Sequence, residues 1–179
     1  MQHPPGAIPP VRDLVLVGGG HANVQVLKRF GMRPEAGVRP TLISSGFSTP
    51  YSGMLPGCIA GIYTPADIEI NLSNLCRFAG ARFIHAEVVG LDLDARRVAL
   101  AGRPSIAYDV LSLNVGARPI APNAGAIAVK PISKFLPKWE TVRSQLEQNP
   151  GNLTIVGAGA GGAELALAAA ARLTQSHVT

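Results

Sequence analysis

The sequence predicts an α/β fold in which a parallel sheet and a β-meander are followed by the beginning of a second parallel α/β unit. Two observations lead to this prediction. A short apolar segment, a glycine cluster and a helix-like pattern follow one another at residues 14–30, and the same order returns at residues 153–173. Strand-like segments fill residues 82–115 between them. A chain of 179 residues has room for one full domain and part of another.

The first glycine cluster has the features of a dinucleotide-binding turn in a Rossmann-like fold. Residues 14–17 form an apolar run typical of a buried strand, and apolar residues recur at helical spacing after the cluster. In a Gly-x-Gly-x-x-Gly fingerprint, Gly18 permits the tight turn and Gly20 leaves room for a pyrophosphate. A helix starting at His21 would offer N–H groups and a partial positive charge to the phosphates. His21 itself would either position phosphate or be a neutral structural histidine. The third glycine position holds Asn23, whose side chain we expect to push the helix slightly off the strand.

The second predicted strand, at residues 41–44, lacks the acidic residue that a dinucleotide fold places after it to bind the adenosine ribose. It ends in Ser44 and Ser45 instead, which weakens an assignment of NAD to this first site. A serine hydroxyl is still able to bind the ribose, with less charge assistance.

The remaining elements follow from periodicity and turn residues. Residues 47–61 form a loop rich in Gly, Pro and aromatic residues that leads into a short apolar helix, and a functional loop and a tight connector are equally good interpretations. We expect helices at residues 67–80 and 133–148, strands at 82–93, 98–100 and 106–115, and a Pro/Gly-rich connector at 118–131. Pro137 would fall in the first turn of its helix, where proline is tolerated.

The second glycine cluster is the more complete fingerprint. A buried strand at residues 153–156 leads into it, and all three glycine positions are filled, by Gly157, Gly159 and Gly162. An alanine-rich helix over residues 164–173 follows, and residues 177–179 begin a further strand. Glu164 at the start of this helix would complement the helix dipole or contact a nucleotide.

Two such fingerprints separated by a meander and a connector resemble the two-dinucleotide-binding-domain flavoproteins, the pyridine nucleotide-disulfide oxidoreductase superfamily. The Thr-Pro loop at residues 48–57 is similar to that of type II NADH dehydrogenases and sulfide:quinone reductases. The sequences at residues 18–23, 49–57 and 130–135 resemble more closely the FAD-containing, NADH-dehydrogenase-like proteins found fused to selenide, water dikinase.

This resemblance implies cofactors and site residues. The first turn would hold FAD, with Gly18, Gly20 and His21 at the pyrophosphate, Thr49 and Pro50 near the isoalloxazine, the Val88 backbone at the adenine and Gly116 closing on the cofactor. The second turn would hold NAD(P)H on Gly157, Gly159 and Gly162, with Glu164 near its ribose and nicotinamide end. The superfamily's Cys-x-x-x-x-Cys redox pair is missing.

The activity implied is hydride transfer from NAD(P)H to FAD and on to a quinone or another acceptor, with no residue required as a catalytic acid or base. The alternative is a non-catalytic dinucleotide-sensing module attached to a selenium-metabolism enzyme. By the same resemblance, the chain is the front part of a larger flavoprotein and has no turnover alone. It would comprise a flexible tail (1–10), the first part of the FAD domain (11–118), a connector with a helix (119–150) and the truncated start of the NAD(P)H domain (151–179). Self-association through Leu165, Leu167 and Leu173 is expected.

Composition limits the other classes of function. With 47% hydrophobic and 15% charged residues, the chain is apolar enough to build a core. The net charge of +5 is scattered, without the basic helix of a nucleic-acid binder. No apolar run is long enough to span a membrane, and residues 1–10 do not form a secretory signal. Cys58 and Cys76 match no metal-ligand spacing and indicate free thiols in a cytoplasmic protein, with peripheral association at the inner membrane face as a further expectation.

Overall fold

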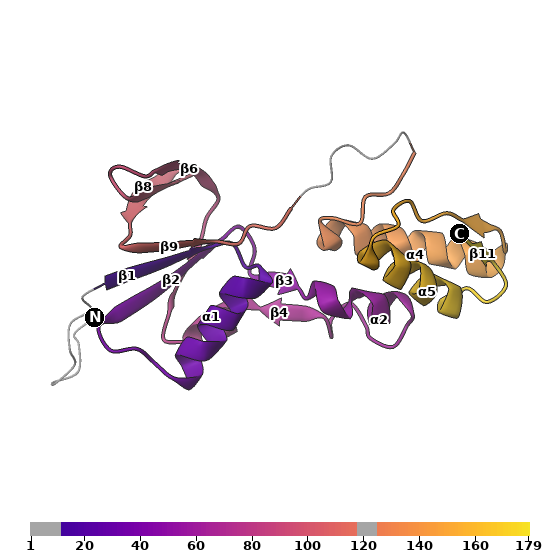
Figure 1. The fold of residues 1–179 in the computed structure, drawn as a ribbon, viewed down its shortest axis with the longest axis horizontal. Coiled ribbons are helices and arrows are strands. Elements are labelled where there is room, and N and C mark those ends of the chain that lie inside the picture. The colour runs from indigo at the N-terminus through magenta and orange to yellow at the C-terminus, as the bar shows by residue number, and fades with distance from the viewer. Residues whose placement is uncertain (1–11, 118–124) are drawn as a thin grey trace. The chain divides into compact units, whose positions relative to one another are not determined.

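The computed structural model describes residues 12–117 and 125–179, which belong to two compact units (Figure 1). The first unit contains residues 12–49 and 70–116, and the second contains residues 50–69 and the chain from residue 117 onward. The expected flexible tail and the first part of the expected connector, at residues 118–124, lie outside the described residues. The division into domains that the sequence suggested stays a prediction.

A four-stranded parallel sheet forms the centre of the first unit, with strand order β5-β2-β1-β9. Its strands are β1 (Arg12–Val17), β2 (Val38–Ser44), β5 (Arg82–His85) and β9 (Val110–Leu113). β1 pairs with β2 on one side and with β9 on the other, so Val15 lies between Thr41 and Leu111. The apolar run predicted at residues 14–17 is therefore an inner strand.

Two layers cover this sheet on opposite faces (Figure 1). Helices α1 (His21–Met32) and α3 (Leu72–Phe78) pack on the face that presents Leu16 and Leu42. The antiparallel meander packs on the face that presents Val15 and Ile43, through Val98 and Leu100. Its strands are β6 (Val88–Asp92), β7 (Arg97–Leu100) and β8 (Arg103–Ala107). The alternation of side chains along each strand explains why successive residues reach different layers. The predicted α/β fold with parallel sheet and meander is confirmed.

A short ribbon joins the two units and corrects one predicted helix. Strand β3 (Ser48–Pro50) pairs with β4 (Glu69–Asn71), and a 3-10 turn (Ser52–Met54) and helix α2 (Leu55–Ile59) follow β3. The helix expected from residue 67 therefore starts only at Leu72. The reason is a cap, because the Asn71 side chain accepts a hydrogen bond from the Asn74 N–H at 2.9 Å.

Two of the predicted strands were also too long. Residues 82–93 break after His85, and residues 106–115 break at Tyr108 and Asp109. In both cases the chain passes between the parallel sheet and the meander. The alternation of apolar residues continues through the connecting residues, so the sequence pattern does not show where one strand ends and the next begins.

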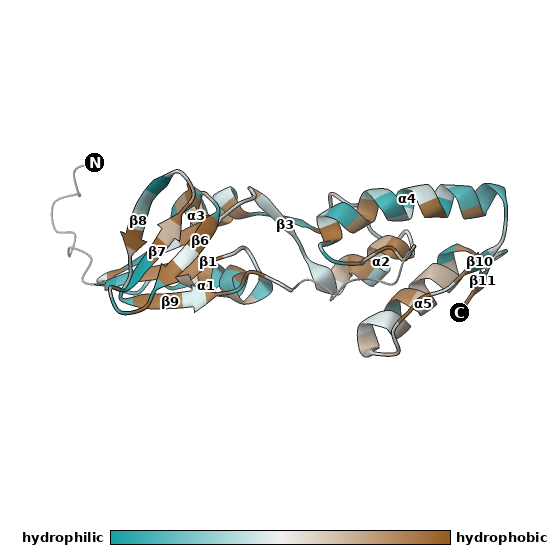
Figure 2. Ribbon diagram, turned by 90° about the horizontal axis from the view of Figure 1, so that it is seen from above, coloured by the Kyte–Doolittle hydropathy of each residue, from teal (hydrophilic) through white to brown (hydrophobic). Residues whose placement is uncertain are grey.

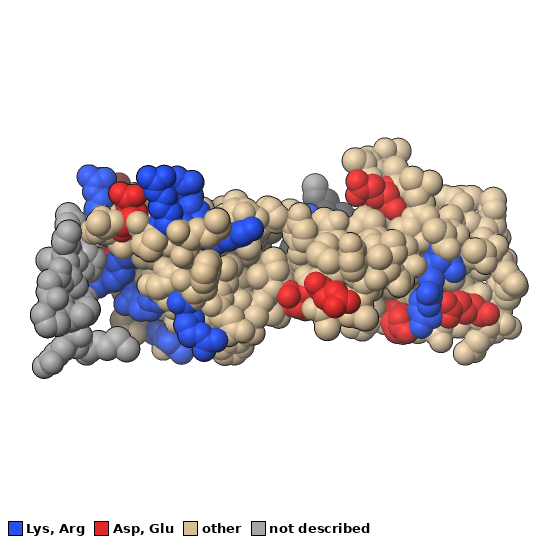
Figure 3. Space-filling model, turned by 90° about the horizontal axis from the view of Figure 1, so that it is seen from below, with Lys and Arg blue, Asp and Glu red and all other residues tan. Residues whose placement is uncertain are grey.

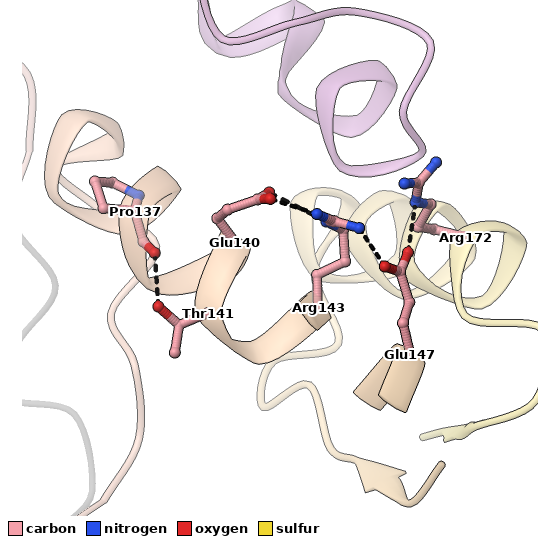
Figure 4. Close-up of polar contacts among 6 residues, drawn as sticks. All are labelled: Pro137, Glu140, Thr141, Arg143, Glu147 and Arg172. Carbon is pink, nitrogen blue, oxygen red and sulfur yellow. Dashed lines mark hydrogen bonds and ion pairs between the residues drawn. The ribbon is translucent and has the colours of Figure 1, made fainter. Parts of the chain in front are cut away.

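The second unit is built from three helices around one apolar core. Helices α2, α4 (Ile132–Gln148) and α5 (Ala160–Arg172) surround Ile59, Trp139 and Ala169. Hydrophobic and hydrophilic residues alternate along α4, as expected for a helix with one buried face (Figure 2). On its outer side, Arg143 bridges Glu140 and Glu147, and Glu147 also pairs with Arg172 of α5 at 3.2 Å (Figure 4).

Four expectations for this unit were wrong. Helix α5 begins at Ala160 rather than at residue 164, and Pro137 is the sixth residue of α4 rather than part of its first turn. The strand expected at residues 153–156 is reduced to β10 (Asn152–Leu153), which pairs in parallel with β11 (His177–Val178). A two-stranded sheet leaves Val156 76% exposed. Finally, Leu173 is buried and Leu165 packs against the core, so of the three leucines expected on the surface only Leu167 is exposed.

The surface of the chain adds two observations. Lys and Arg side chains gather over the first unit on the face drawn in Figure 3. Within the described ranges, no helix combines the length and hydrophobicity needed to cross a membrane.

Candidate functional site

The first glycine turn lies at the carboxyl end of β1 and is held by its neighbours on both sides. The Gly18 N–H donates to Ile43 O of β2 at 2.8 Å, and the Gly20 N–H donates to Asn114 O, just past β9, at 3.1 Å. Gly18 has a φ of 86°, which side-chain-bearing residues rarely adopt. A Cβ on Gly20 would lie 2.6 Å from Asn114 O, so a side chain there would clash with backbone. The turn therefore requires glycine at the first two of the three fingerprint positions.

Asn23, at the third fingerprint position, has a structural role that was not predicted from the sequence: its side chain hydrogen-bonds three neighbouring segments. Its side chain is fully buried, and its Nδ2 donates to Val17 O at 3.0 Å and to Gly18 O at 2.9 Å. Its Oδ1 accepts from the Ser112 hydroxyl of β9 at 2.8 Å. The side chain is thus accommodated by bonding the strand, the turn and β9 together. A polar residue at a position that calls for close packing was the available signal.

Asn114 was also missed, because no local motif connects it with a turn more than ninety residues earlier. Besides its backbone bond to Gly20, its side-chain Oδ1 accepts from the Ala22 N–H at 2.9 Å. That N–H belongs to the first turn of α1, where the helix leaves its donors without intrahelical partners. Asn114 therefore acts as a cap for α1 that is supplied by another strand.

The carboxyl ends of β2 and β5 form the next part of the same sheet edge. Ser44 is opposite His85 in the parallel pairing, and its Oγ accepts from the Gly46 N–H at 3.3 Å. This bond uses an acceptor position of the hydroxyl and leaves its proton for another acceptor. The Ala86 N–H donates to Ser44 O at 3.0 Å, which brings the segment leading to Val88 beside Ser44. Ligands of parallel α/β sheets bind at this edge.

An aromatic pair lies at this edge and was not singled out from the sequence. The rings of Phe47 and His85 stack with centroids 4.3 Å apart and an interplanar angle of 29°. The His85 Nε2 lies 2.9 Å from Ser45 O, which orients the ring. Phe47 is 57% exposed although it is a large apolar residue. An exposed, oriented aromatic surface is suited to stacking against a planar ring.

The other predicted residues of the first site have simpler surroundings. Gly116 follows β9 with a φ of 80°, and a Cβ there would have no neighbour within 4 Å, so the space beside it is open. Thr49 is the last residue of the first unit in β3, and Pro50 is the first residue of the second. His21 is the first residue of α1, as predicted, and is exposed.

The second glycine turn has the shape that its complete fingerprint predicts. Gly157 has a φ of 130°, and a Cβ on Gly162 would overlap the carbonyl oxygen of Gly157. Gly162 thus allows close packing of helix and turn. A Cβ on Gly159 would meet nothing within 4 Å, so open space adjoins the start of α5. Glu164 is exposed and lies in the second turn of α5 rather than at its start.

The two cysteines are buried and poorly reactive. Cys58 lies in the core of the second unit and Cys76 in α3, and burial raises the pKa of both thiols, that of Cys76 to about 11. Neither thiol is therefore suited to redox chemistry, since the thiolate is the reactive form. The described residues contain no cluster of His, Cys, Asp or Glu able to hold a metal ion.

A family model described as pyridine nucleotide-disulphide oxidoreductase matches residues 12–179. No curated protein sequence matched the chain.

Among solved structures, similarity is found to a NAD-dependent persulfide reductase from A. fulgidus, with a TM-score of 0.72 and 18% identity over 93% of this chain and 33% of that one. The covalent putidaredoxin reductase–putidaredoxin complex matches with a TM-score of 0.69 and 23% identity over 93% of this chain and 41% of that one. The sulfide:quinone oxidoreductase from the hyperthermophilic bacterium Aquifex aeolicus matches with a TM-score of 0.67 and 22% identity over 87% and 38%. The chain thus spans well under half the length of these proteins.

Proposed function

The chain belongs to the pyridine nucleotide-disulphide oxidoreductase family, an oxidoreductase family whose cofactors are FAD and NAD(P), and we propose that it provides the flavin site and part of the nicotinamide site of an NADH-dehydrogenase-like enzyme. The observation that carries this proposal is the pair of glycine turns, each of which joins the end of a strand to the start of a helix. Gly18 and Gly157 take positive φ values in the two turns. Both turns leave N–H groups at a helix start, which is the environment that binds phosphate.

In the first unit, the residues fit FAD. The turn at Gly18 and Gly20, with His21 behind it, would hold the pyrophosphate, and Ser44 would bind the adenosine ribose through its hydroxyl proton. The Val88 backbone would lie at the adenine, since its segment runs beside Ser44. Open space next to Gly116 suits a cofactor that passes the end of β9. Thr49, the last residue of this part of the first unit, would lie near the isoalloxazine, and by the resemblance so would Pro50, which follows it.

In the second unit, the residues fit a nicotinamide nucleotide. Gly159 would let the pyrophosphate approach the start of α5, because the space beside it is open. A side chain at this position would occupy that space. Gly157 and Gly162 would shape the turn. Glu164, exposed in the second turn of α5, would lie near the ribose and nicotinamide end.

The chemistry follows from the cofactors. When bound, NAD(P)H and FAD supply a hydride transfer from nicotinamide C4 to flavin N5, and a quinone or another acceptor reoxidises the flavin. The chain's own residues bind and orient the two nucleotides, and none needs to act as a proton donor or acceptor. A protein acceptor is a further candidate, because one similar structure is a complex of putidaredoxin reductase with putidaredoxin and another is an NADH:rubredoxin oxidoreductase.

The two sites can be tested separately. FAD binding is measured by the change in flavin absorbance and fluorescence, and NADH and NADPH binding by titration calorimetry. Gly159→Ala is the informative variant, because its new Cβ meets no protein atom and should leave the fold intact. We expect this substitution to lower the affinity for NAD(P)H at least about tenfold, the equivalent of about 1.4 kcal/mol, and to leave the affinity for FAD unchanged. Unchanged nicotinamide affinity in this variant would contradict the assignment of the second turn.

The alternative function is a nucleotide-sensing module that serves a selenium-metabolism enzyme, as implied by the resemblance of residues 18–23, 49–57 and 130–135 to proteins fused to selenide, water dikinase. Stopped-flow mixing of the FAD-loaded protein with NADH and with NADPH distinguishes the two functions. Bleaching of the flavin supports the oxidoreductase. Binding of both nucleotides without bleaching supports the sensor.

Three further properties belong to the proposal. Steady-state reduction of an added quinone by residues 1–179 alone is not expected, because the chain spans 33–41% of the three similar structures. A cytoplasmic location, with peripheral membrane association, would suit a quinone acceptor. Self-association would involve the exposed Leu167 and Val156, and sedimentation velocity measures it.

A further inference from the structure

Asn114 places its side chain where the first glycine turn leaves space. Its Oδ1 accepts a hydrogen bond from the Ala22 N–H at 2.9 Å, and a Cβ on Gly20 would overlap Oδ1 and clash with the adjoining amide carbon at 2.5 Å. The carboxamide therefore lies directly beside the second glycine of the fingerprint. It does so at the end of β9, so its position is set by the sheet and not by α1.

A pyrophosphate bound at this turn needs the same place. The second glycine of the fingerprint exists so that the pyrophosphate can approach the backbone, and the N–H groups of the first helical turn bind its oxygens. The Ala22 N–H is one of these groups. One N–H cannot donate a full hydrogen bond to the carboxamide and to a phosphate oxygen at once, because both need the same direction and a distance near 2.9 Å.

We propose that Asn114 sets the affinity of the first site by competing with the pyrophosphate for the Ala22 N–H. This inference rests on the proposed function, and it adds that ligand binding is an exchange in which a phosphate oxygen replaces Asn114 Oδ1. The exchange is favourable because a hydrogen bond to a charged phosphate oxygen is roughly twice as strong as one to a neutral amide oxygen. The exchange nevertheless breaks the hydrogen bond by which Asn114 caps α1. The observed affinity for pyrophosphate is therefore lower than the affinity that the turn would have without Asn114.

Two substitutions at this position have opposite expected effects on affinity. Asn114→Ala removes the competitor, and a lost side-chain cap of about 1 kcal/mol corresponds to about a fivefold gain in affinity. Asn114→Asp keeps the shape and the acceptor but adds a negative charge at the helix N-terminus. That charge strengthens the cap and repels phosphate, so affinity should fall at least about tenfold at low ionic strength. The loss should shrink as salt is added, because partly exposed charges are screened.

The chain offers a matched control at a different helix. Asn71 caps α3 through the same kind of bond, from the Asn74 N–H to its Oδ1 at 2.9 Å. Asn71→Ala therefore removes a helix cap without changing a residue of the glycine turn, and it also removes the bond that Asn71 Oδ1 accepts from the Ser73 hydroxyl at 2.8 Å. A merely structural role for Asn114 predicts that Asn114→Ala and Asn71→Ala behave alike.

The experiment compares stability and affinity in the same proteins. Unfolding by urea is measured without ligand, and binding of FAD and of ADP, which contains the pyrophosphate and adenosine alone, is measured by titration calorimetry. We expect Asn114→Ala and Asn71→Ala to lower the urea midpoint similarly, while Asn114→Ala alone binds ADP and FAD about fivefold more tightly. Weaker or unchanged binding in Asn114→Ala, with FAD and ADP still bound by the unmodified protein, would overturn the exchange but leave the flavin site standing. Failure of every variant to bind either ligand would overturn the flavin site and the exchange together.

Discussion

Replacing Asn23 by the glycine that the dinucleotide fingerprint calls for should destabilise this protein. The motif alone suggests the opposite, because glycine would let α1 pack closer to β1. In the structure, however, Asn23 is fully buried and makes three hydrogen bonds, to Val17 O, Gly18 O and the Ser112 hydroxyl. Asn23→Gly removes all three and leaves the Gly18 carbonyl and the Ser112 hydroxyl without these partners.

The size of the effect follows from these bonds. Each buried hydrogen bond contributes about 1 kcal/mol net, and Val17 O keeps a second donor, the Asn114 N–H at 2.8 Å. We therefore expect Asn23→Ala to lower the free energy of unfolding by about 2–3 kcal/mol. Asn23→Gly should cost about 0.5–1 kcal/mol more, because glycine is a poor residue inside a helix.

Urea denaturation followed by far-ultraviolet circular dichroism measures this free energy. Gln25→Ala is the matched control, since Gln25 is exposed on the same helix and its change should stay within about 0.5 kcal/mol. If Asn23→Gly were as stable as the unmodified protein, helix packing rather than the Asn23 bonds would hold the turn. The structural role inferred for Asn23 would then be refuted.

Three other predictions concern single contacts. Thr41→Val should raise the free energy of unfolding by up to about 1 kcal/mol in urea denaturation, because the buried Thr41 hydroxyl has no partner among the described residues and valine has the same shape. Hydrogen bonds from the Arg39 guanidinium hold the pKa of Asp13 below its usual value, so this pair stabilises the fold above about pH 4. That contribution is lost as the pH falls through the lowered pKa, and Arg39→Ala should reduce the difference between the free energies of unfolding at pH 7 and pH 3 by less than about 1 kcal/mol. The exposed Phe47 ring is proposed to stack against the adenine, so Phe47→Ala should weaken ADP binding by about 1 kcal/mol in calorimetry and leave the binding of FMN, which has no adenine, unchanged. Phe78→Ala is the control, because Phe78 is 56% exposed and Phe47 is 57% exposed.

The elements that were predicted well are those with many sheet or core partners. The strand at residues 14–17 is buried on both faces and so is continuously apolar, and the helix from His21 has apolar spacing because it has one fixed buried side. The strand at residues 153–156 carries the same apolar signal, yet only Asn152–Leu153 is regular strand, because β11 is its sole neighbour within the described sheet. The local sequence indicates that a segment tends to form a strand, but the number of neighbouring strands that pair with it determines how long the strand is.

Other features were hidden because their signals are weak or distant. Asn71 before a helix is a capping signal that the apolar pattern from residue 67 concealed. The alanine-rich helix α5 has small residues on every side, so the sequence did not tell the buried Leu173 from the exposed Leu167. The Phe47–His85 stack joins two strand ends that are far apart in the chain, and only the pairing of β2 with β5 brings them together.

The same distinction explains the chemistry of the first glycine turn. Its glycines could be recognised from the sequence because the local backbone geometry of the turn requires them. Two groups from β9 and the residue just after it contact this turn and helix: the Ser112 hydroxyl donates to Asn23, and the Asn114 side chain accepts from the Ala22 N–H. Both contacts involve an asparagine, whose side-chain amide can donate and accept hydrogen bonds. An asparagine can therefore bond backbone N–H and C=O groups that would otherwise be available to a ligand. The fingerprint therefore identifies where a pyrophosphate would lie, and by the exchange proposed above Asn114, just past the end of β9, would determine how strongly the turn holds one.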